Sequence, residues 1–146
     1  MLPGIFAGFT LLAICVAIHA AGLTYVLGRL SAWLAPESRD SGKASWILIR
    51  AAWILAALHI CEILLWAGYY RLWGCVEDFA TAVYFSGVSY TTIGYGDVVM
   101  PRRYWFLGPM EGLTGILMCG LSTGFFFVAV SRVFAVKGTA TIEGNP

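Results

Sequence analysis

Three long apolar runs, at residues 5–28, 46–70 and 104–135, most constrain what this chain can fold into. Each is long enough for a helix to cross the hydrocarbon core of a bilayer, which takes roughly 20 residues. Only 12% of the 146 residues are charged, whereas soluble globular domains carry about 25%. The chain is therefore predicted to be an all-α membrane protein with three transmembrane helices. Its net charge of +1 gives no reason to expect a nucleic-acid partner.

The remaining segments differ in character. Residues 29–45 form a polar connector after the first helix, which is assigned to residues 1–28. Residues 77–90 are apolar but too short to span, which predicts a re-entrant helix. Acidic residues at its start favour a helix N-terminus, where the helix dipole attracts negative charge. Residues 136–146 have too little apolar content to fold alone and are predicted to form a flexible tail.

Directly after the re-entrant helix comes the loop Thr91-Thr92-Ile93-Gly94-Tyr95-Gly96-Asp97. Glycine adopts positive φ without a Cβ penalty, so Gly94 and Gly96 let consecutive carbonyl groups point to the same side. Thr92 adds a hydroxyl at the inner end of this row. Such a row of oxygens can replace the water around a dehydrated monovalent cation. The carbonyls expected to do so are those of Thr92, Ile93, Gly94 and Tyr95.

This loop resembles the selectivity filter of the potassium channels, with Ile93 at a position where valine is commonest. The resemblance implies a channel that conducts K⁺ passively, with no enzymatic activity and no cofactor besides the permeant ions. Residues 46–135 are similar to the two-span pore unit of that family. The unit would consist of an outer helix at 46–70, a pore helix at 77–90, the filter at 91–97 and an inner helix at 104–135.

One loop supplies one oxygen to each layer of an ion cage, and a cation needs several. The chain holds a single copy of the loop, so four identical chains would have to surround a closed cyclic axis. The expected partners are therefore further copies of the chain in a homotetramer, K⁺ and membrane lipid. The resemblance also implies that Thr91, Gly96 and Asp97 shape the loop and its outer mouth. Within the inner helix, Gly120 is the candidate gating hinge.

The surroundings of the filter depart from the family pattern. Some members carry an acid four residues before the filter threonine, where this chain has Val88. Many carry tryptophans on the pore helix at the positions of Tyr84 and Phe85. Tyr84 could still hydrogen-bond the filter aspartate, and Ser89 is the candidate partner for the filter tyrosine.

Four ionisable residues, His19, His59, Glu62 and Glu111, fall inside the spans, where such groups indicate either a functional site or hydrogen bonds to neighbouring helices. Glu62 and Glu111 are expected at a similar depth, roughly 10 to 12 Å below the outer face. Both should turn towards the pore helix or a neighbouring helix, with Glu111 bracing the filter from behind. One alternative function is a membrane redox or metal-binding protein that uses His19, His59 and Glu62 as ligands. Another is a weakly selective cation channel.

Basic residues predict the orientation, because cytoplasmic segments carry an excess of Lys and Arg. Those near the first connector and the end of the last span place both segments in the cytoplasm: Arg29, Arg39, Lys43, Arg50, Arg132 and Lys137. Arg71, Arg102 and Arg103 oppose the rule. The predicted topology is a multi-pass protein of the cell membrane with the N-terminus outside, the C-terminus in the cytoplasm and the filter near the outer face.

Overall fold

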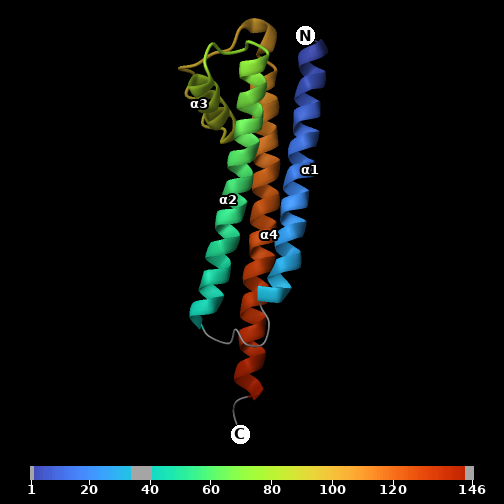
Figure 1. The fold of residues 1–146 in the computed structure, drawn as a ribbon, viewed down its shortest axis with the longest axis vertical. Coiled ribbons are helices and arrows are strands. Elements are labelled where there is room, and N and C mark those ends of the chain that lie inside the picture. The colour runs from blue at the N-terminus through green and yellow to red at the C-terminus, as the bar shows by residue number, and fades with distance from the viewer. Residues whose placement is uncertain (1, 34–40, 144–146) are drawn as a thin grey trace.

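The computed structural model describes residues 2–33 and 41–143, which form four α-helices and one short 3₁₀ helix (Figure 1). Three of these α-helices are long and apolar enough to cross a membrane, as the sequence predicts. The fourth, α3, is the predicted short re-entrant helix. The elements are α1 (Leu2–Trp33), α2 (Ser41–Leu72), α3 (Phe79–Tyr90), η2 (Arg102–Tyr104) and α4 (Leu107–Glu143).

The three long helices run side by side, and α3 packs at one end of the bundle (Figure 1). The chain begins at this same end, and α4 leads to the opposite end. α3 contacts both α2 and α4, whereas α1 lies against α2 and α4. The loop that follows α3 is therefore held at the end of the molecule where α1 starts.

The three spanning helices are longer than the sequence predicts, whereas α3 begins two residues later than predicted, at Phe79, and α4 begins at Leu107 rather than at residue 104. α1 continues to Trp33 and α2 already begins at Ser41, so most of the predicted connector at residues 29–45 is helical. α4 runs to Glu143, so the flexible tail predicted for residues 136–146 is wrong over most of its length. Extending an existing helix adds a hydrogen bond per residue without a new nucleation cost, so polar residues can join the end of a span. Residues 34–40 and 144–146 lie outside the described part.

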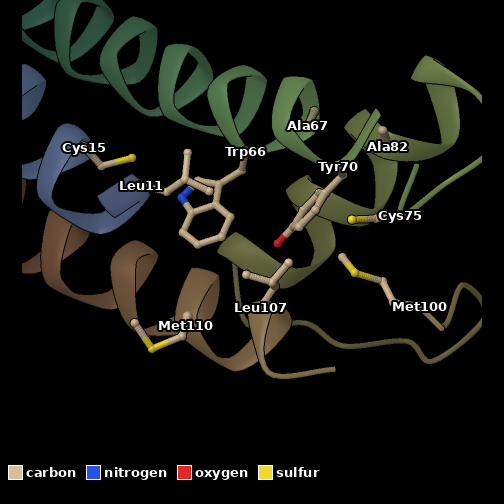
Figure 2. Close-up of a cluster of buried hydrophobic side chains, with 10 residues drawn as sticks. All are labelled: Leu11, Cys15, Trp66, Ala67, Tyr70, Cys75, Ala82, Met100, Leu107 and Met110. Atoms are coloured by element: carbon tan, nitrogen blue, oxygen red, sulfur yellow. The ribbon is translucent and has the colours of Figure 1, made fainter. Parts of the chain in front are cut away.

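A cluster of buried side chains joins all four α-helices near the α3 end of the bundle (Figure 2). Trp66 and Tyr70 of α2 are fully buried and point into the space between α1, α3 and α4. The further members are Leu11, Cys15, Ala67, Cys75, Ala82, Met100, Leu107 and Met110. A second cluster joins α1, α2 and α4 nearer the other end and comprises Val26, Leu30, Ile47, Ala51, Leu55, Phe125 and Ala129.

Glycines set two close approaches between helices. A Cβ on Gly22 would lie 2.5 Å from the Leu58 side chain, so α1 and α2 meet closely there. A Cβ on Gly115 would lie 1.9 Å from the carbonyl oxygen of Tyr90, the last residue of α3. Small residues allow this kind of backbone contact in membranes, where apolar surface gives no drive for helices to associate. α4 is thereby brought directly against the start of the candidate filter.

Candidate ion-conduction site

The position of the filter is set by how α3 begins and ends. Asp78 caps the N-terminus: its Oδ1 accepts from the Thr81 amide at 2.9 Å and its Oδ2 from the Thr81 hydroxyl at 2.6 Å. The Thr81 hydrogen bonds lower the pKa of Asp78 below its ordinary value. At the other end, the amide of Thr91 donates to the Gly87 carbonyl at 3.1 Å and closes the last turn. The filter loop therefore leaves α3 in a fixed direction.

The backbone of the loop alternates in handedness. φ is +60° at Thr92, +60° at Gly94 and +76° at Gly96, so every second residue has positive φ. The sequence predicts this conformation for the two glycines but not for Thr92. Thr92 is the one non-glycine residue with positive φ in the described part of the chain. For an L-residue this conformation costs roughly 1–2 kcal/mol, which marks Thr92 as a strained position of the kind found at functional sites.

The amide groups of the loop show where its carbonyls point. The amides of Thr92, Ile93 and Gly94 turn back towards α3, donating to Ser89 O at 3.0 Å and to Val88 O at 3.0 and 3.3 Å respectively. The described residues contain no cis peptide bond. In a trans peptide the carbonyl points away from the amide hydrogen of the same plane. Three consecutive carbonyls, those of Thr91, Thr92 and Ile93, therefore point away from the end of α3, as a row of ion ligands requires.

The candidate filter loop lies exposed in the single chain. All seven residues from Thr91 to Asp97 are exposed, and the apolar side chains of Ile93 and Tyr95 are 54% and 69% exposed. A groove of about 440 Å³ runs beside them, between α3 and α4, with Ser89, Thr92 and Gly112 in its lining. The adjoining face of α4 is also exposed at Leu113, Ile116, Leu117 and Leu121. The loop and this face of α4 form one continuous surface that the chain itself does not cover.

At the end of the filter the Tyr84 hydroxyl donates to Asp97 Oδ2 at 2.6 Å, which is the hydrogen bond anticipated from the sequence. The bond lowers the pKa of Asp97 and raises the pKa of Tyr84. The Val98 amide holds the other carboxylate oxygen at 3.1 Å. Within one chain no hydrogen bond joins Ser89 to Tyr95, both of which are described. The mouth of the filter is thus fixed through its aspartate.

Behind α3, the fully buried Glu111 of α4 accepts from the Tyr70 hydroxyl at 2.6 Å and from the Ser86 hydroxyl. Its carboxylate therefore connects α2, α3 and α4, as expected for an acid that turns away from lipid. It holds the pore helix rather than the filter itself. Glu62 binds Tyr90 instead, four residues further along α3. At 1.5 Å per residue the two carboxylates lie about 6 Å, or one helical turn, apart along α3.

The glycines of α4 divide into two groups. Gly112 and Gly115 lie against the end of α3, where added Cβ atoms would meet the Ser89 and Tyr90 backbone. Nothing lies within 4 Å of the Cβ positions at Gly120 and Gly124, and α4 continues unbroken past both. The close contact of α4 with α3 is therefore made at the first two of these glycines.

The structure brings together the three residues considered as metal ligands. The ligand atoms of His19, His59 and Glu62 lie within 4.8 Å of one another, although the residues come from two helices. Each ring nitrogen already has a hydrogen-bonding partner. Tyr90 and Ser122 complete this network, and sequence reasoning did not anticipate either. The only signals for them were the position of Tyr90 beside the filter and that of Ser122 between two glycines.

Three spans, a re-entrant helix and an uncovered loop with aligned carbonyls define the pore of an ion channel. A family model described as an ion channel matches residues 56–132, just over half of the chain. The chain belongs to this family, whose pore unit is of the two-span potassium-channel type. The match begins within α2 and ends within α4, so α1 lies outside it. Comparison with curated proteins and with solved structures found no match.

Proposed function

We propose that the protein is a homotetrameric potassium-selective channel. The single observation that carries this proposal is the backbone of the loop, in which φ is positive at every second residue from Thr92 to Gly96 and the amides of residues 92–94 turn towards α3. Carbonyls arranged in this way can coordinate a dehydrated cation at several successive levels. Thr92, Ile93, Gly94 and Tyr95 would supply the oxygens.

The uncovered surface around the filter supports assembly. Lipid can cover the exposed apolar side chains of α4, but it cannot cover the exposed non-helical backbone of residues 91–97, which at membrane depth must be buried in protein or line a water path. One loop also contributes one oxygen per level, so a complete cage requires copies of the chain around an axis. Four copies complete the cage of a potassium-type filter.

The same unit defines an orientation in the cell membrane. The N-terminus of α1 lies at the filter end, and α4 ends on the opposite side (Figure 1). Basic residues near the ends of α1 and α4 support a cytoplasmic location for that opposite side. The filter would then face the outside. Membership in a channel family favours ion transport over catalysis.

A bilayer recording with K⁺ on one side and Na⁺ on the other tests the proposal. The reversal potential of the parent should lie near that of a K⁺-selective pore. Gly94→Ala should reduce the selectivity, because its side chain would occupy positive φ at roughly 1–2 kcal/mol in each subunit. Gly68→Ala is the matched control, since a Cβ there meets nothing within 4 Å and φ is not positive. Equal reversal potentials for the parent and Gly94→Ala would refute the assignment of the filter.

A further inference from the structure

Five side chains from all four α-helices form a closed ring of hydrogen bonds inside the bundle. His19 Nδ1 lies 2.8 Å from Glu62 Oε1, and His19 Nε2 lies 2.9 Å from the Ser122 hydroxyl. His59 Nε2 lies 3.0 Å from the same hydroxyl, and His59 Nδ1 lies 2.8 Å from the Tyr90 hydroxyl. The contact between the Tyr90 hydroxyl and Glu62 Oε2 closes the ring.

The ring has five contacts, and each needs one proton. An ionised glutamate brings no proton, whereas a neutral histidine, a serine and a tyrosine bring one each. With Glu62 ionised and both histidines neutral, the ring therefore holds four protons for five contacts. One contact would then place two lone pairs face to face. A fifth proton removes this conflict, and a sixth would create a new one between two hydrogens.

The position of the ring decides where the fifth proton resides. His19 and Glu62 are fully buried, and Tyr90 and Ser122 are nearly so, within helices that span the membrane or pack between the spans. A carboxylate paired with an imidazolium would separate charge in this medium, whereas a protonated Glu62 leaves every member neutral. The protons can then run in one direction: from Tyr90 to Glu62, from Glu62 to His19, from His19 to Ser122, from Ser122 to His59 and from His59 back to Tyr90.

We propose that this ring is a proton-binding site, in which a proton on Glu62 closes the network and holds the inner end of the filter. Tyr90 is the last residue of α3 and directly precedes the filter loop. Ser122 lies two residues beyond the candidate hinge, Gly120. Through Tyr90 and Ser122 the ring connects α1, which lies outside the matched pore unit, to both the filter and α4. The number of protons in the ring therefore affects both. This link to conduction rests on the proposed channel function.

Few charged groups lie near the ring. His59 is its most accessible member, with 21% of its side chain exposed. The thiols of Cys15 on α1 and Cys119 on α4 are within electrostatic range of Glu62 and Tyr90 respectively. Among the described residues no lysine or arginine forms an ion pair with the ring.

Infrared spectroscopy of the full chain in lipid tests the site without reference to conduction. As the pH is raised stepwise, the parent should lose the protonated-carboxyl band of Glu62. Glu62→Gln should lack this titrating band, whereas Glu111→Gln should retain it. In Ser122→Ala the ring is already open, so the band should be lost at lower pH than in the parent. Thr123→Ala is the matched control, because its hydroxyl bonds only its own helix, and it should follow the parent.

Flux of K⁺ from liposomes tests the consequence. The parent flux should fall about tenfold over the pH range in which the Glu62 band is lost, which corresponds to about 1.4 kcal/mol. The amide of a glutamine side chain supplies the missing donor permanently, so Glu62→Gln should keep its flux at alkaline pH. Thr123→Ala should show the parent's decline. A Glu62 band that titrates while the parent flux stays constant would overturn the link to conduction.

Three further outcomes separate the proposals. Absence of any titrating carboxyl band that Glu62→Gln removes and Glu111→Gln retains would overturn the proton site even in a conducting protein. A Glu62 band that titrates in a protein without K⁺ flux would leave the site standing and refute only the channel function. Stoichiometric zinc binding abolished by Glu62→Gln would assign the cluster to a metal and overturn the proton site.

Discussion

Replacing Gly115 by alanine tests the contact between α4 and the end of the pore helix. An added Cβ would lie 1.9 Å from the Tyr90 carbonyl oxygen and 2.8 Å from its carbonyl carbon. Cβ atoms in proteins do not approach other heavy atoms within 3.0 Å, so the two helices must separate by about 1.1 Å. Both atoms belong to the backbone, so no side-chain rotation can relieve the clash.

The expected cost follows from comparing glycines along the same helix. Overpacking costs typically about 1–3 kcal/mol, while alanine in a helix gains roughly 1 kcal/mol over glycine. Gly124→Ala should gain this helix stability without a steric clash, because nothing lies within 4 Å of its Cβ position. The difference between the two variants therefore isolates the clash and should reach the upper part of this range. Gly112→Ala, whose Cβ would lie 3.4 Å from Ser89 O, should fall between them.

The assay is the stability of the protein in detergent micelles, followed by thermal or denaturant unfolding at fixed protein concentration. Gly115→Ala should unfold well below Gly124→Ala, and its K⁺ selectivity should fall because Tyr90 carries the start of the filter. If Gly115→Ala and Gly124→Ala unfold together and select K⁺ equally, the close contact between α4 and α3 is not as described.

Three other predictions concern the mouth, the topology and the gating. Because the Tyr84 hydroxyl lowers the pKa of Asp97, external acid should neutralise the mouth only below the ordinary aspartate value of 3.8. Tyr84→Phe should move the midpoint of an acid titration of conductance up towards that value, and an unchanged midpoint would contradict the hydrogen bond. Single cysteines at Gly4 and Asn145, in a cysteine-free background, should react with an impermeant thiol reagent from opposite sides of the membrane; labelling from one side would rule out three spans. Opening should depend weakly on voltage, because no span carries repeated arginines and each gating charge contributes about 2.3 kcal/mol per 100 mV. Recordings in which several charges per subunit move would contradict this expectation.

The sequence alone determined the number of spans, the short helix between the last two spans and the place of the candidate filter loop. These features depend on local properties: lengths of apolar runs, and two glycines at alternate positions that accept positive φ. The hydrogen bond between Tyr84 and Asp97 could also be predicted from the sequence, because the re-entrant segment leads directly into the loop that it supports. Helix ends were less predictable, since a span extends into polar residues once it has formed.

Only the tertiary structure decided which residues meet across the bundle. Periodicity gives the face of a helix but not the rotation or depth at which it meets its neighbour. His19 therefore could not be paired in advance with Glu62, 43 residues away, or with Ser122, 103 residues away. The strained φ of Thr92 has the same origin, because hydrogen bonds from the loop to the end of α3 impose a conformation that threonine does not prefer by itself. The close approach at Gly115 likewise depends on the packing of α4 against α3, which leaves no space for a single methyl group.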